Sequence, residues 1–278
     1  MNIKQFQALL CYDLRYGFQC NRGKWLFALL VQVYFCTLAG RLSLNSNAPI
    51  GFLERLTFLF QGLPEYHLSQ TGTFELPVHW LIFHAFLLFL AGFYPVQDLT
   101  QSGGQAFIRS GRRGYWLLSK ALWVCATVAG YYLMLTGVLA VCSLPAGGPW
   151  APPAAMSALF GINVAELSFS EIMLYWWVMP ILVSAALCLT EVLLSLFIEP
   201  LLAFFVMLSC LVASVFWTSP ALIGNYSMLL RSNLLSGDPA ISAQNCFAVC
   251  LLLIALASVL GTKLFRSKDI LLSQGGPR

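Results

Sequence analysis

Residues 172–196, IMLYWWVMPILVSAALCLTEVLLSL, and residues 198–217, IEPLLAFFVMLSCLVASVFW, decide the fold class of this chain. A helix needs about 20 mostly apolar residues to cross the hydrocarbon core of a bilayer, and both segments meet that length. Each contains a single charged residue, Glu191 in the first and Glu199 in the second. The segments therefore predict two membrane-spanning helices joined by a short turn near Glu199 and Pro200.

The composition of the whole chain supports a membrane environment. Of its 278 residues, 59% are hydrophobic and 9% are charged, whereas a soluble domain has about 25% charged and roughly 45–50% apolar residues. So few charges cannot cover the surface of a soluble protein of this length. The net charge of +4 comes without a long Lys/Arg run, which indicates membrane orientation and no nucleic-acid partner.

The apolar segments predict an all-α integral membrane protein with six transmembrane helices. An N-terminal amphipathic helix is expected in residues 1–24, because residues 3–20 place apolar side chains on one face and polar ones on the other. We expect it to lie in the membrane interface; the alternative is a helix packed on protein. A six-helix transmembrane domain (25–265) and a cytoplasmic tail (266–278) follow, with spans at about 25–44, 76–96, 115–144, 172–196, 198–217 and 243–265.

The basic residues predict the orientation of these spans. Cytoplasmic loops carry an excess of Lys and Arg. If the N-terminus is cytoplasmic, all of the 15 Lys and Arg residues except Arg41, Arg55 and Arg231 fall on the cytoplasmic side. Six spans with both termini in the cytoplasm satisfy this rule, whereas five or seven spans would place a terminal basic cluster outside.

No motif for catalysis or metal binding is apparent in the sequence. There is no phosphate-binding loop and no H-E-x-x-H, and His79 and His84 are spaced so that they do not converge on one metal ion. No pair of carboxylates has a spacing that suggests acid–base chemistry. Most of the nine cysteines lie in apolar runs and are expected to act as small hydrophobic residues. We expect no enzyme activity, no metal and no cofactor bound by this chain.

One predicted cytoplasmic loop, QDLTQSGGQAFIRSGRRGYW at 97–116, combines turn, apolar and basic segments in an order that a simple linker does not require. A turn at Gly103 and Gly104 is followed by apolar Phe107 and Ile108 and then by a basic, glycine-containing stretch. Trp116 is expected to anchor the chain at the membrane interface, and Lys120 to lie at the membrane edge. Two explanations are open: cytoplasmic positive charge alone, or a short helix at 98–114 that docks on a soluble partner; we favour the second.

This layout resembles the membrane subunits of the second class of ABC exporters, the ABC-2 type permeases. Three features carry the resemblance: the amphipathic start at 3–20, the loop at 98–114 and the apolar outer loop at 218–242, which suggests a half-inserted or interfacial hairpin. The run from Ile108 to Trp116 and Lys120 is similar to the corresponding stretch of small permeases of Firmicutes that export peptides or antibiotics. The long outer loop at 45–75 departs from the family pattern.

The resemblance implies a permease in the plasma membrane of a bacterium, with a dimeric ABC ATPase subunit, a second permease copy or homologue, and lipids as partners. ATP and Mg would be bound by the ATPase. The residues implied in coupling to it are Asp98, Gln105, Phe107, Ile108, Arg109, Arg112 and Arg113. Glu191 and Glu199 are candidates for the translocation path, because carboxylates inside a membrane are costly. The alternative functions are a non-catalytic membrane assembly or immunity protein and, with less support, a membrane-embedded enzyme.

Overall fold

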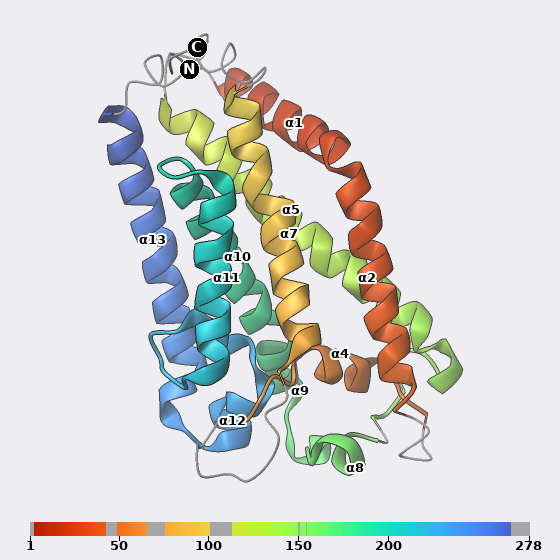
Figure 1. The fold of residues 1–278 in the computed structure, drawn as a ribbon. Coiled ribbons are helices and arrows are strands. Elements are labelled where there is room, and N and C mark those ends of the chain that lie inside the picture. Colours follow the sequence, from red (N-terminus) through yellow and green to blue (C-terminus); the bar gives the residue numbers. More distant parts are fainter. Residues whose placement is uncertain are drawn as a thin grey trace.

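The computed structural model describes residues 3–42, 49–65, 76–100, 113–149, 151–153 and 155–267. These ranges are almost entirely helical and contain no strand. Figure 1 shows the longest helices running between two ends of a bundle, with short helices gathered at one end. The long helices are α1 (Ile3–Cys20), α2 (Arg22–Gly40), α5 (Val78–Thr100), α7 (Arg113–Cys142), α10 (Met179–Ser195), α11 (Pro200–Phe216) and α13 (Ala243–Ser267).

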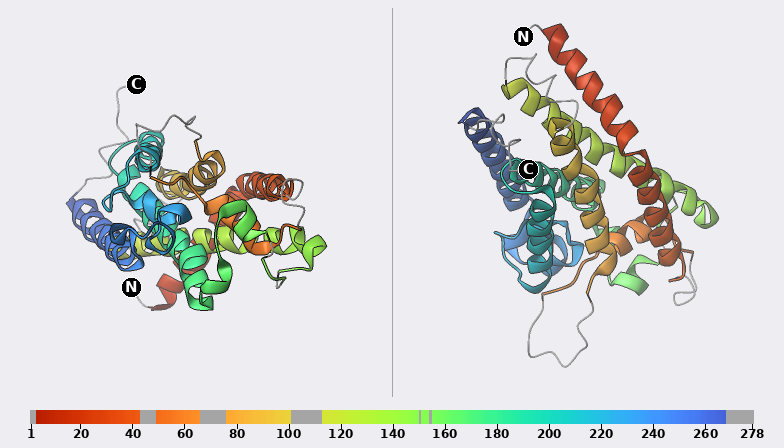
Figure 2. Two further views of the ribbon diagram at one scale, coloured as in Figure 1. Left: turned by 90° about the horizontal axis from the view of Figure 1, so that it is seen from below. Right: turned by 45° about the horizontal axis from the view of Figure 1, so that its top comes forward.

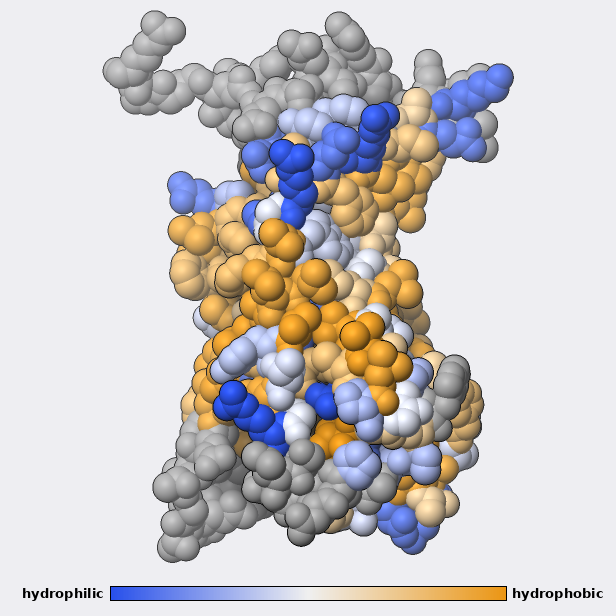
Figure 3. All heavy atoms as spheres, turned by 90° about the vertical axis from the view of Figure 1, so that its right-hand side faces the viewer, coloured by the Kyte–Doolittle hydropathy of each residue, from blue (hydrophilic) through white to orange (hydrophobic). Residues whose placement is uncertain are grey.

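The described residues contain five helical segments that are long and apolar enough to cross a membrane: Arg22–Gly40, Val78–Asp98, Gly114–Cys142, Phe169–Ser195 and Ala243–Gly261. Helix α11 is also apolar but has 17 residues. Figure 3 shows a broad apolar band across one face, with hydrophilic residues near both ends. The predicted all-α membrane fold is confirmed at this level, and the sixth span and the location of the termini stay predictions.

Two prolines explain the shape of the fourth apolar segment. It begins with α9 (Phe169–Met173), continues through a π-helical turn, η3 (Leu174–Val178), and ends as α10. Pro180 donates no hydrogen bond to the carbonyl of Trp176, and its ring would clash with that carbonyl in a regular helix, so a wider turn relieves the contact. At the other end, α11 begins at Pro200, a residue suited to the first turn of a helix. The predicted turn at this point is confirmed.

Helix α1 leads into α2 after the single residue Asn21 and packs on α7. Asp13 and Gly17 are its buried residues, and both face α7. The predicted helix over residues 3–20 is therefore present. One of its faces packs on protein, as the alternative interpretation proposed, while the interfacial location stays a prediction.

Helix α10 lies at the centre of the bundle, in contact with α5, α7, α11 and α13. Figure 2 shows α13 and α2 at opposite sides of the bundle. The bundle is filled by large aromatic side chains, among which Trp80, Trp123 and Trp176 are fully buried.

The predicted outer loops fold against the bundle. The apolar stretch that follows the first span forms α4 (Phe52–Phe60), and the next loop contains η1 (Leu144–Ala146), α8 (Met156–Phe160) and η2 (Val164–Glu166). Residues 218–242 form η4 (Ile223–Ser227), η5 (Leu229–Arg231), α12 (Asn233–Ser236) and η6 (Pro239–Ile241). Ile223, Tyr226 and Met228 are buried, which accounts for the apolar character of that loop. Its depth in a membrane stays a prediction.

Candidate functional site

A buried ion-pair cluster joins three helices at one end of the bundle; we call it the Lys120 cluster (Asp13, Tyr94, Asp98, Ser119 and Lys120). The Nζ atom of Lys120 lies 2.6 Å from Oδ1 of Asp13 and 2.6 Å from Oδ2 of Asp98. Ser119 Oγ donates to Oδ2 of Asp13 at 2.5 Å, and the hydroxyl of Tyr94 donates to Oδ1 of Asp13 at 3.3 Å. One ammonium group thus holds together α1, α5 and α7.

The Lys120 cluster is closed to solvent. The side chains of Lys120 and Asp13 are 0% exposed, and that of Asp98 is 2% exposed. The ammonium group also lies over two aromatic rings, 4.7 Å from the centroid of Tyr94 and 5.3 Å from that of Trp116. Buried charges persist only when they are paired and hydrogen-bonded, and here two acids share a single cation. Loss of that cation would leave both acids uncompensated.

Close packing between α1 and α7 brings Asp13 within reach of Lys120. Gly17 lies one turn after Asp13 on the same face of α1, and a Cβ atom there would overlap the indole ring of Trp123. Trp123 is fully buried and packs on Tyr94, with ring centroids 4.4 Å apart. A glycine at position 17 is therefore what allows α1 to seat Asp13 against α7.

The cluster lies at the base of the predicted coupling loop. Asp98 is in the last turn of α5, and Lys120 is near the start of α7, so the loop 101–112 begins and ends close to these residues. The predicted coupling residues Gln105, Phe107, Ile108, Arg109 and Arg112 lie outside the described residues, as does the side chain of Arg113. Among the predicted coupling residues, the structure places Asp98 alone, and it directs that carboxylate into the bundle.

The structure adds burial to two interpretations from the sequence, while the depth of both residues in a membrane stays a prediction. Trp116, predicted as an interfacial anchor, is 1% exposed and packs on Leu196 and Phe197. Lys120, predicted at the membrane edge, is fully buried in the protein. Both cases of burial follow from the way α1 and the end of α10 cover the start of α7, which the sequence of α7 does not show.

Asp13 and Ser119 were not recognised from the sequence. The signal for Asp13 was its position: on a helical projection it lies next to Phe6, at the edge of the apolar face of residues 3–20. A carboxylate there must be paired or must turn back to water. Ser119 offers no comparable signal, since a serine within an apolar helix commonly bonds to its own backbone.

The two acids proposed for a translocation path have opposite environments. Glu199 is exposed and occupies the N-cap position of α11, without a side-chain capping hydrogen bond, which matches the simpler interpretation of an acid at a helix start. Glu191 is 0% exposed and faces α5, where a Cβ atom on Gly92 would overlap its carboxyl group. The structure does not bring Glu191 and Glu199 together.

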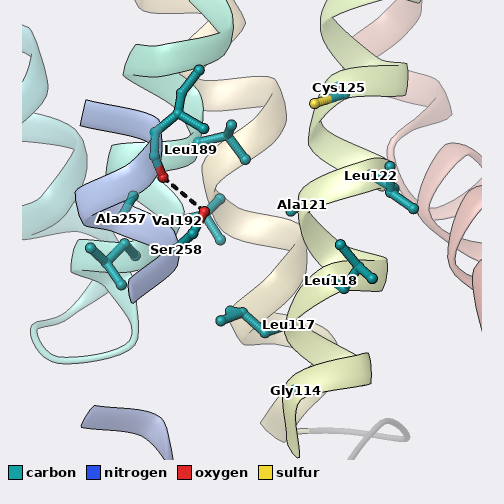
Figure 4. Close-up of a pocket in the computed structure, with 12 residues that line it drawn as sticks. Gly114, Leu117, Leu118, Ala121, Leu122, Cys125, Leu189, Val192, Ala257 and Ser258 are labelled. Carbon is teal, nitrogen blue, oxygen red and sulfur yellow. Dashed lines mark hydrogen bonds between the residues drawn. The ribbon is translucent and has the colours of Figure 1, made fainter. Parts of the chain in front are cut away.

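An apolar groove of about 260 Å³ lies between α7, α10 and α13 (Figure 4). Its only side-chain hydroxyl, that of Ser258, donates to the carbonyl of Ile254 at 2.8 Å. The groove therefore presents no convergent polar groups for chemistry. Across the part of the chain that the structure describes, no group of three His, Cys, Asp or Glu side chains is arranged to hold a metal ion.

Comparison with protein families places the chain. Residues 25–271 match the family described as "Protein of unknown function (DUF2705)", and because this match spans most of the 278 residues, the chain belongs to that family. Comparison with curated proteins and with solved structures gave no match.

Proposed function

We propose that this chain is the permease subunit of an ATP-driven exporter of the ABC-2 type, and that it couples to a separate ATPase through residues 98–114. The Lys120 cluster carries this proposal. A protein docked on the loop 101–112 would act on the ends of α5 and α7, and the salt bridges of Lys120 join those ends to Asp13 of α1. Helix α1 continues almost directly into α2. A movement at the loop would thus reach three spans through one buried contact.

Such a subunit requires a bundle with its coupling loop and both termini on the same side. In Figure 1 the start of α1, the end of α5, the start of α7 and the end of α13 lie at one end of the bundle. Helix α11, with 17 residues, is about 25 Å long and at the lower limit of roughly 17–25 residues for a span. Together with the distribution of Lys and Arg, this arrangement supports six spans and cytoplasmic termini.

Reporter fusions test this topology. We expect a fluorescent protein fused after Arg278 to fluoresce, and alkaline phosphatase fused after Pro149 to be active, because the former would be cytoplasmic and the latter outside. Phosphatase fused after Gly104 is the matched control and should be inactive. If α11 did not span the membrane, a cytoplasmic N-terminus would place the C-terminus outside. The fluorescent protein after Arg278 would then be dark, while phosphatase after Pro149 would still be active.

Charge reversal tests the coupling. We expect Arg112→Glu with Arg113→Glu to abolish co-purification of a co-expressed ABC ATPase subunit, while insertion into the membrane is retained, because basic side chains in the loop would contact the ATPase. ATP turnover of the purified complex gives a second readout, which should depend on the presence of this chain. Arg41→Glu is the control, since Arg41 is an exposed arginine at the opposite end of α2. Equal recovery of the ATPase with both variants would contradict the proposal.

A further inference from the structure

Glu191 is an acid without a partner at the centre of the bundle. Its side chain is 0% exposed, and neither carboxyl oxygen has a hydrogen-bond partner among the described residues. The carboxyl group presses on the backbone of α5 at Gly92, the only residue type that leaves room for it. Glu191 thus occupies the contact between α5 and the central helix α10.

The charge nearest to Glu191 does not form an ion pair with it. Lys24 of α2 interacts electrostatically with Glu191, but its Nζ lies 4.4 Å from the ring centroid of Phe89 and 5.2 Å from that of Phe93. In the described part of the chain, no salt bridge within 4.0 Å links Lys24 to an acid. The other titratable group with an electrostatic effect here is Cys188, on α10 itself. Neither group satisfies the carboxyl oxygens.

The surroundings of Glu191 suit an acid that carries its proton. Gly92 of α5 offers the carboxyl group no side chain, and Lys24, which acts on it electrostatically, forms no salt bridge with it among the described residues. A charged carboxylate in a dry, apolar interior is strongly disfavoured unless it is paired.

We propose that Glu191 is a proton-binding site, occupied in the packed arrangement of α5 and α10. Release of the proton would produce a carboxylate that the closed contact does not solvate, so it requires α5 and α10 to separate and admit water. Proton binding at Glu191 and closure of the α5–α10 contact are then one event. This inference rests on the described helices alone and is independent of any partner ATPase.

Infrared difference spectroscopy on the full chain in lipid tests the protonation. We expect the C=O band of a neutral carboxylic acid at neutral pH in the wild type, its loss in Glu191→Gln, and its retention in Lys24→Met. Glu191→Asp, which keeps an acid, should displace the band and not remove it. Identical spectra for wild type and Glu191→Gln in that region would overturn the proposal, as would an acid band that arises only in Lys24→Met, because Lys24 would then hold Glu191 as a carboxylate.

Thiol labelling tests the link to opening. Cys188 is buried on α10 and Cys250 is buried on α13, so each reports on access to its own helix. We expect a membrane-permeant maleimide to modify Cys188 faster in the wild type than in Glu191→Gln, and this difference in rate should grow as the pH rises. Cys250 should react at the same rate in both proteins. Equal rates at Cys188 at every pH would show that proton release occurs without separation of α5 and α10.

Discussion

Replacement of Lys120 by methionine is expected to lower the free energy of unfolding by about 3–5 kcal/mol, the usual cost of removing one partner from a buried ion pair. Methionine fills a similar volume, but it leaves the carboxylates of Asp13 and Asp98 in a closed site with no cation. The contacts of α1 with α5 and α7 should loosen together, since Lys120 is the residue that the two acids share. Thermal unfolding of the detergent-purified protein measures the change.

Replacement of either acid of the Lys120 cluster should lower the free energy of unfolding by less than Lys120→Met does, and the number of contacts should set the order of the two acids. Among the described residues, Asp13 accepts from Lys120, Ser119 and Tyr94, whereas Asp98 accepts from Lys120 only. We therefore expect Asp13→Asn to cost more than Asp98→Asn, and the triple variant with Lys120→Met to recover part of the stability, because no charge remains buried. Lys263→Met is the matched control, because Lys263 is an exposed lysine on α13, and it should change the free energy of unfolding by less than about 0.5 kcal/mol. A loss no larger for Lys120→Met than for Lys263→Met would contradict the role of the cluster.

The sequence predicted the long apolar helices well, five of which are long enough to cross a membrane, because membrane insertion depends on segment composition. Transfer of a run such as 172–196 into lipid is favourable whatever its neighbours are, and a proline such as Pro200 marks a boundary by its own chemistry. The Lys120 cluster could not be predicted in this way. Asp13, Asp98 and Lys120 come from three helices, and helical periodicity gives the face that a residue occupies but not the helix that covers it.

The same limit explains the basic residues that departed from the charge rule. Arg55 donates to the backbone carbonyls of Cys36 and Ile50, and Arg231 donates to three backbone carbonyls. Both are held at the end of the bundle that contains α4 and α12 (Figure 1), where their charges are used in hydrogen bonds to the backbone. A count of Lys and Arg treats them as exceptions, because the carbonyls that hold them are distant in the sequence.

Arg231 joins several segments at this end of the bundle, and we expect its replacement to give the second large effect. Its guanidinium group donates to the carbonyls of Ser214 and Val215, to the carbonyl of Leu63 and to the side-chain oxygen of Asn225. Ser214 and Val215 lie in the last turn of α11, where carbonyls have no intrahelical partner and a cation is favoured. Burial lowers the pKa of the Arg231 guanidinium, and the negative charge of Glu65 acts in the opposite direction. An arginine titrates so far above neutral pH that it stays charged.

Arg231→Met is expected to lower the free energy of unfolding by about 3–5 kcal/mol, since each buried carbonyl left without a donor costs about 1–3 kcal/mol. Arg231→Lys should recover only part of this loss, because an ammonium group keeps the charge but does not reach carbonyls on two sides as the planar guanidinium does. Thermal unfolding gives the size of the effect, and hydrogen exchange at the end of α11 gives its location. Arg41→Met removes an exposed arginine from the same end of the bundle and should have little effect. Equal stability of Arg231→Met and Arg41→Met would contradict this prediction. The carbonyls around Arg231 would then have other hydrogen-bond donors, and apolar contacts alone would hold this end of the bundle together.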